Sequence, residues 1–203
     1  MILTAAAEII LVFTLFITLW RLSQIGIADN ETPQASLMFA VLLLALFTIA
    51  CTAGVGAVRY YALTPAAPAD LISTKIIGFR LDDLHDAMSA FSRNFAMPLY
   101  LFASVWLWGR LPLWFAPALL AMAMLPQVGM MSLFTDASLV LMLLALLQLP
   151  AARPSVLLAL GCLLAVPLSV LLIGNDDLAM ACFHLLLAGH FLQYSRAVKR
   201  LNK

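Results

Sequence analysis

Residues 2–20 read ILTAAAEIILVFTLFITLW, an apolar run with a single charged residue, Glu8. A helix rises about 1.5 Å per residue, so about 20 residues cross the roughly 30 Å hydrocarbon core of a bilayer. No positive segment precedes the run, and Arg21 follows it. We therefore expect a retained membrane helix rather than a cleaved signal peptide.

The composition of the whole chain agrees with that first stretch. Of its 203 residues 65% are hydrophobic and only 10% are charged, whereas a soluble domain carries about 25% charged residues. The net charge of +1 gives no reason to expect a nucleic-acid partner. Three cysteines (Cys51, Cys162 and Cys182) stand singly in apolar segments, which is typical of buried, inert thiols. The composition predicts a membrane protein with the lipid bilayer as its main partner.

Further apolar runs of membrane-spanning length follow the first. They predict an all-α, polytopic membrane helix bundle in one domain covering residues 1–203. About seven spans are expected, or six if the short fifth does not cross, and they cover residues 2–20, 35–60, 81–108, 111–131, 134–150, 154–173 and 176–195. Residues 71–79 are expected to lie at the membrane interface. Pro98 is expected to kink the third span. Gly174 and Asn175 are expected to end the sixth helix and cap the start of the seventh.

The distribution of Lys and Arg predicts the orientation, because cytoplasmic loops of membrane proteins are enriched in both. With seven spans the termini lie on opposite sides. The C-terminal side then holds Arg21, Arg110, Arg153, Arg196, Lys199, Arg200 and Lys203, and the other side holds Arg59, Lys75, Arg80 and Arg93. This bias favours an N-terminus outside and a C-terminus in the cytoplasm. The compact loops fit a bacterial inner membrane.

Ionisable residues converge on the outer ends of four predicted helices. A charge near the centre of a membrane costs at least about 2.5–3.5 kcal/mol, so such residues are candidates for function. In the third span, four polar residues share one face at helical spacing: Asp82, Asp86, Ser89 and Arg93. His85, Ser89 and Ser92 form an adjoining face. Glu8, Arg59, Asp177 and His184 lie in the outer halves of three other helices. An outward-facing polar pocket is therefore predicted.

We assign roles within this pocket by side-chain chemistry. His85, His184 and Asp86 are the candidate catalytic residues, and the two histidines are also candidate ligands for a divalent metal. The candidate substrate-binding residues are Arg59, Ser89, Arg93, Glu8 and Asp177. Expected ion pairs join Glu8 to Arg93, and Arg59 to Asp82 or Asp86. Simpler interpretations stay open: the aspartates suit a solvated helix start, Arg59 suits the interface, and His190 is expected to hydrogen-bond between helices.

These residues favour a hydrolase-like membrane enzyme, or a binding protein, that acts on a lipid or small amphiphile. The alternatives are a small transporter or proton-coupled carrier, which would need to be a homo-oligomer to alternate access, and a structural or assembly protein. Haem ligation by two histidines ranks lower. A Ser-His-Asp hydrolase is disfavoured, because the sequence lacks any GxSxG signal.

The predicted seven-helix, N-outside arrangement with His and Asp inside the membrane is similar to one known superfamily, that of the alkaline ceramidases and the progestin and adiponectin receptors. That superfamily carries two histidines four residues apart in its last helix, and Ser and His in an early helix. Here His184 and His190 are six apart, and the second span has no histidine. The likeness is therefore one of architecture.

Overall fold

The computed structural model describes residues 1–29, 33–108 and 153–201, which are mostly helical. Five helices carry the fold: α1 (Ile2–Asp29), α2 (Pro33–Ala62), α4 (Met97–Trp108), α7 (Arg153–Leu172) and α8 (Asp176–Leu201). A shorter helix, α3 (Leu81–Phe91), leads into α4. The predicted spans 111–131 and 134–150 lie outside the described residues.

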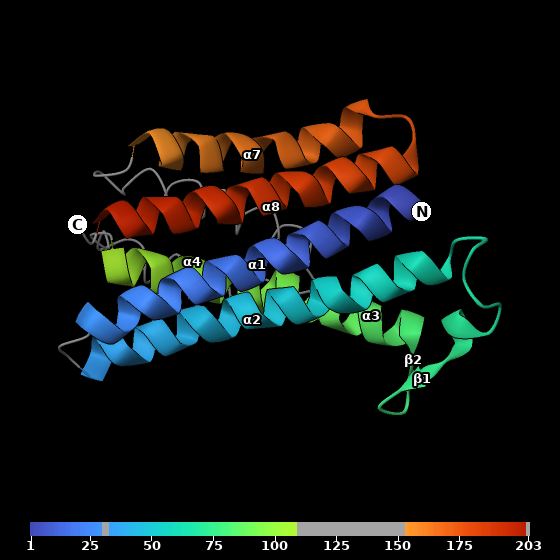
Figure 1. Cartoon of the computed structure of the whole chain (residues 1–203), viewed down its shortest axis with the longest axis horizontal. Coiled ribbons are helices and arrows are strands. Elements are labelled where there is room, and N and C mark those ends of the chain that lie inside the picture. Colours follow the sequence, from blue (N-terminus) through green and yellow to red (C-terminus); the bar gives the residue numbers. More distant parts are fainter. Residues whose placement is uncertain (30–32, 109–152, 202–203) are drawn as a thin grey trace, which may run out of the picture.

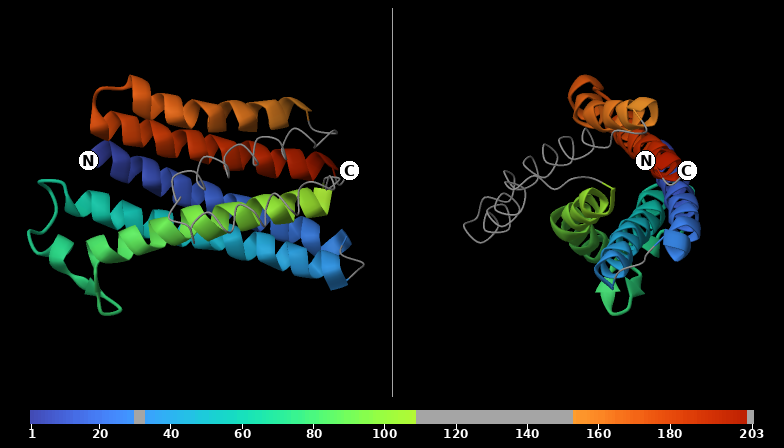
Figure 2. Two further views of the ribbon diagram at one scale, coloured as in Figure 1. Left: turned by 180° about the vertical axis from the view of Figure 1, so that it is seen from behind. Right: turned by 90° about the vertical axis from the view of Figure 1, so that its left-hand side faces the viewer.

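The long helices run side by side along the molecule (Figure 1). Helix α8 packs against both α1 and α7, while α2 packs against α1, α3 and α4. The amino group of Met1 lies 2.9 Å from Asp177, so α1 and α8 begin together and run parallel. The two ends of the chain consequently lie at opposite ends of the bundle (Figure 1). Figure 2 shows α4 on the flank of α2, away from α7.

Three of the helices are long and apolar enough to cross a membrane: Ile2–Ile25, Pro33–Ala62 and Asp176–Lys199. Their surfaces carry large exposed apolar side chains, among them Phe13, Trp20 and Leu44, while Leu15 and Leu46 are fully buried. An apolar outer surface over an apolar core suits a helix that is surrounded by lipid. These helices support the prediction that the chain spans a membrane.

The predicted third span, residues 81–108, forms a nearly continuous helix with one irregular turn. Ser92–Ala96 (η2) is π-helical and joins α3 to α4. Pro98 lies two residues after its end, and proline has no N–H to donate to the carbonyl four residues earlier. A π-helical turn is one way for a helix to absorb such a gap. The expected irregularity near Pro98 therefore takes the form of a wider turn just before it.

The connection between α2 and α3 is the one part of the described chain that departs from an all-α fold. It contains a short 3₁₀ turn, η1 (Leu71–Ser73), and a small antiparallel hairpin of β1 (Lys75–Ile76) and β2 (Phe79–Arg80).

Between α7 and α8, the side-chain oxygen of Asn175 accepts a hydrogen bond from the Leu178 N–H at 3.0 Å. The predicted helix cap at Asn175 is confirmed.

Candidate functional site

Four helices bring polar side chains together, and we call Glu8, Tyr60, His85, Ser89 and His184 the Glu8 cluster. Glu8 lies about 9 Å along α1 and His184 about 12 Å along α8. Because these two helices begin together and run parallel, both residues reach a similar depth. Oε1 of Glu8 lies 3.0 Å from Nε2 of His184, and both side chains are buried. A carboxylate and an imidazole thus share one buried contact between α1 and α8.

This contact leaves polar atoms without partners. Oε2 of Glu8 is buried and has no hydrogen-bond partner. Nδ1 of His184 makes no hydrogen bond of good geometry, although the Met180 carbonyl one turn earlier lies toward it. A buried polar atom without a partner costs about 1–3 kcal/mol, so such atoms concentrate where a protein has a use for them. The Glu8 cluster therefore retains hydrogen-bonding capacity that its own residues do not satisfy.

Gly56 in α2 makes room for the Glu8 carboxylate. A Cβ atom at this position would lie 2.5 Å from Oε1 of Glu8 and 3.4 Å from Nε2 of His85. Tyr60, one turn later on the same helix face, places its ring beside both imidazoles, with centroid distances of 5.7 Å to His85 and 6.1 Å to His184. Gly56 and Tyr60 of α2 therefore form the surface against which the Glu8 carboxylate and both histidines pack.

His85 links two further polar groups along α3. Its Nε2 atom lies 3.3 Å from Oγ of Ser89, one helical turn later, and its Nδ1 atom lies 3.4 Å from Oδ1 of Asp86. These distances are at the long end for hydrogen bonds. The order hydroxyl, imidazole, carboxylate is that of an activated serine nucleophile. The Asp86 side chain is 74% exposed and that of His85 only 12%, so this series of polar groups leads from solvent into the Glu8 cluster.

Arg59 sits beside the Glu8 cluster and already has a carboxylate partner. Its Nε atom lies 2.7 Å from Oδ1 of Asp82, which confirms the predicted pairing of these residues. The guanidinium carbon also lies 5.4 Å from the centroid of the Tyr60 ring, at cation–π distance. Arg59 therefore joins α2 to α3 and holds the ring of Tyr60.

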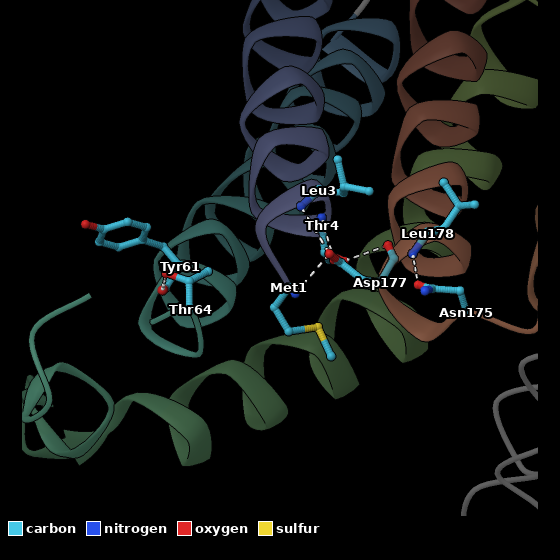
Figure 3. Close-up of polar contacts among 8 residues, drawn as sticks. All are labelled: Met1, Leu3, Thr4, Tyr61, Thr64, Asn175, Asp177 and Leu178. Carbon is cyan, nitrogen blue, oxygen red and sulfur yellow. Dashed lines mark hydrogen bonds and ion pairs between the residues drawn. The ribbon is translucent and has the colours of Figure 1, made fainter. Parts of the chain in front are cut away.

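Asp177, a predicted substrate-binding residue, connects two helix starts. Its carboxylate accepts hydrogen bonds from the backbone N–H of Thr4 at 3.0 Å and from the Thr4 hydroxyl at 2.6 Å (Figure 3). It also pairs with the amino group of Met1. These bonds fix the start of α1 against the start of α8. That alignment sets Glu8 level with His184, so Asp177 positions the cluster from outside it.

Arg93 is not brought to Glu8, and the expected pair of these two residues is wrong. Glu8 pairs with His184, and Arg93 is an exposed residue of η2 with no ion pair among the described residues. The prediction assumed unbroken α-helical spacing from Asp82 to Arg93. Helical spacing gives the face of a residue but not its depth. A Cβ atom at Gly56 would lie beside both Glu8 and His85, whereas Arg93 follows His85 by eight residues, about 12 Å further along the helix.

A second polar group lies deeper in the bundle, and we call it the His190 network. Nδ1 of His190 lies 3.0 Å from the Ala159 carbonyl in α7, and its Nε2 lies 3.2 Å from the Tyr100 hydroxyl in α4. Ser104 donates to the Tyr100 carbonyl and lies 2.6 Å from the Tyr194 hydroxyl. The prediction that His190 hydrogen-bonds between helices is confirmed. With both ring nitrogens engaged, this histidine has no free atom for a haem iron.

Two members of this arrangement were absent from the sequence-based list. Tyr60 and Gly56 share one face of α2, but neither is charged, so neither stood out as a candidate in an apolar helix. In the part of the chain that the structure describes, no three His, Cys, Asp or Glu side chains are grouped closely enough to hold a metal ion.

Comparisons with known protein families, curated proteins and solved structures found no match. Function is therefore inferred from the residues of the Glu8 cluster.

Proposed function

We propose that the chain is a membrane-embedded hydrolase that binds a lipid or small amphiphile at the Glu8 cluster and cleaves an ester or amide bond in it. Seven spans, an N-terminus outside, a C-terminus in the cytoplasm and a bacterial inner membrane belong to the same proposal. Parallel α1 and α8, with chain ends at opposite ends of the bundle, support an odd number of crossings. The Glu8 cluster would then face the outer leaflet.

The observation that carries the proposal is the order of Ser89, His85 and Asp86. His85 takes the proton of the Ser89 hydroxyl at Nε2 as Oγ forms a bond to the substrate carbonyl carbon. Asp86, at Nδ1, favours the tautomer that leaves Nε2 free to accept. The bond to the leaving group then breaks, and that group takes the proton from His85. A water molecule repeats the sequence and releases the acid. Catalytic hydrogen bonds are often long before substrate binds.

Glu8 and His184 supply the binding half of the site. The unpartnered Oε2 of Glu8 accepts a hydrogen bond from a hydroxyl, amide or amine of the substrate head. Satisfying that atom removes the cost of leaving it buried and unpaired. Arg59 is held by Asp82, and Arg93 lies away from the cluster, so neither is assigned to an anionic head group. The site therefore favours a head that donates hydrogen bonds.

A fluorophosphonate probe, which reacts with activated serines, tests the nucleophile in the full-length protein in lipid nanodiscs. We expect Ser89 to be labelled, with the modified peptide identified by mass spectrometry. Ser89→Ala should abolish labelling, His85→Ala should slow it at least about 100-fold, and Ser92→Ala, a neighbouring buried serine, should leave it unchanged. Labelling that survives Ser89→Ala, or no labelling of the folded wild type, would contradict the hydrolase.

One observation favours a second candidate, a proton-coupled carrier. The Glu8–His184 contact joins two ionisable side chains inside helices of membrane-spanning length. A carrier predicts proton entry into proteoliposomes with a trapped pH-sensitive dye under an imposed membrane potential, and loss of that entry in Glu8→Gln. Equal rates in wild-type, Glu8→Gln and protein-free vesicles would remove the carrier and leave the hydrolase standing.

A further inference from the structure

The hairpin between α2 and α3 has two faces of different chemistry. Lys75 pairs across the strands with Arg80, and Ile76 pairs with Phe79. Ile77 and Gly78 form the turn, both with positive φ, at 53° and 86°. The hairpin projects from the bundle at the end where the N-terminus lies (Figure 1). None of the hairpin residues belongs to the Glu8 cluster.

Ile77 is an unfavourable residue for its position in two respects. A β-branched side chain at φ 53° is strained, and such strain costs of order 1–3 kcal/mol, whereas glycine or asparagine adopts this conformation readily. The side chain is also 88% exposed, so no burial within the described chain offsets the strain. Phe79 beside it is 58% exposed. Contact with an apolar medium outside the chain would bury both side chains and so explain why they stand at an exposed, strained tip.

The opposite face of the hairpin concentrates positive charge. Like charges directly across two strands repel one another, and Lys75 and Arg80 form such a pair. Both residues are exposed, and neither has an ion-pair partner among the described residues. A phosphate group between the two cations would replace their repulsion by two attractions. The paired cations therefore indicate that this face of the hairpin can bind an anion.

The position of the hairpin identifies what supplies both the apolar medium and the anion. It follows the end of a candidate span, α2, whose last turn carries the exposed aromatic residue Tyr61. Aromatic and cationic residues at a helix end are typical of the layer where lipid head groups meet water. We propose that the β1–β2 hairpin is an interfacial anchor: Ile77 and Phe79 insert among the lipids around the bundle, and Lys75 and Arg80 bind the phosphates of anionic lipids.

A spin label on the hairpin of the full-length protein in nanodiscs tests this anchor. Cys51, Cys162 and Cys182 are replaced by Ala, and Phe79→Cys carries the label, with Ser73→Cys as the matched control. We expect the label at 79 to collide several-fold more with oxygen than with a water-soluble nickel chelate, and the label at 73 to show the reverse. Ile77→Asn, which relieves the strained turn, should bring the label at 79 toward the values at 73.

The charge face is tested with nanodiscs of neutral lipid and of neutral lipid mixed with phosphatidylglycerol. Anionic lipid should deepen the label at 79, and the double variant Lys75→Ser, Arg80→Ser should remove that dependence on lipid composition. A label at 79 as open to the nickel chelate as the label at 73 would overturn the proposal. The proposal would also be overturned if the label at 79 were shielded from the nickel chelate in lipid-free detergent and if this shielding increased with protein concentration. A second copy of the chain would then cover the tip.

Discussion

The Glu8 cluster and the His190 network are built around two histidines of the same helix, six residues apart, yet they differ in how completely their polar atoms are paired. In the His190 network both ring nitrogens have partners, and the Tyr100 and Tyr194 hydroxyls are each within hydrogen-bond distance of a neighbour. In the Glu8 cluster Oε2 of Glu8 has no partner. A fully paired network stabilises the bundle, whereas an incompletely paired one is available to a ligand.

The groups that face the polar atoms explain the difference, because aromatic rings lie at similar distances from both histidines: 6.1 Å and 5.1 Å from His190, and 6.1 Å and 5.0 Å from His184. Beside His190 the Tyr100 ring carries a hydroxyl within hydrogen-bond distance of the imidazole. Beside Glu8 the neighbouring helix presents Gly56, which has no side chain to fill the space or offer a hydrogen bond. Two histidines with similar apolar neighbours in the sequence therefore have different roles.

The largest effect on stability is expected at His190. His190→Ala removes two hydrogen bonds and leaves the buried Tyr100 hydroxyl without its partner, while the Ala159 carbonyl keeps its bond within α7. Hydrogen bonds between membrane helices are worth about 0.6–2 kcal/mol each, so we expect a loss of about 2–3 kcal/mol once the lost packing is included. Unfolding of the purified protein in mixed micelles measures it. Leu185→Ala, at an exposed site on the same helix, is the control, and equal losses in both would break the comparison.

Glu8→Gln is the matching change in the Glu8 cluster, and its effect on stability should be smaller. Glutamine keeps the shape and one hydrogen bond to His184 but removes the buried charge. We expect the free energy of unfolding to change by less than about 1 kcal/mol or to rise, while fluorophosphonate labelling of Ser89 slows. If Glu8→Gln destabilised the protein as much as His190→Ala, the Glu8 cluster would be a structural network like its counterpart.

Gly56→Ala tests whether the missing side chain keeps the site open. The added Cβ meets the end of the flexible Glu8 side chain rather than backbone, so the carboxylate can move aside. That movement separates Glu8 from His184, and we expect slower labelling of Ser89. The cost of the unpaired groups, about 1–3 kcal/mol, is offset in part by the roughly 1 kcal/mol by which alanine is favoured over glycine in a helix. Gly54→Ala is the matched control, since a Cβ there meets nothing within 4 Å. Identical labelling rates in the two variants would exclude this role for Gly56.

The smallest effect is expected at Asp177. Asp177→Asn weakens the bonds to Met1 and Thr4 without removing a buried side chain. We expect faster amide hydrogen exchange in the first turn of α1, at Leu3 and Thr4, and unchanged exchange around Leu15, because end fraying is local. Exchange that accelerates along the whole helix would show that Asp177 does more than hold the helix start.

The sequence predicted the helices better than it predicted the contacts of the site. Apolar runs of membrane-spanning length marked α1, α2 and α8, and Asn175 marked a helix cap. Helical spacing correctly grouped His85 with Ser89, because four residues make about one turn. Spacing failed at Arg93, because it does not say which residue of another helix lies at the same depth: Glu8 lies beside His85, about 12 Å before Arg93 along the helix. The hairpin at residues 75–80 has strands too short for a periodic signal.

The sequence alone determined that the chain is apolar enough for a membrane and that its few ionisable residues would have to find partners there. Those conclusions depend on composition and on the cost of burying charge, which are properties of each residue and its near neighbours. Tertiary structure decided the partners: His184 rather than Arg93 for Glu8, and Tyr100 for His190. Pairing between helices depends on their relative depth and rotation. Asp177 fixes the start of α1 to the start of α8, and no pattern within a single helix predicts that contact.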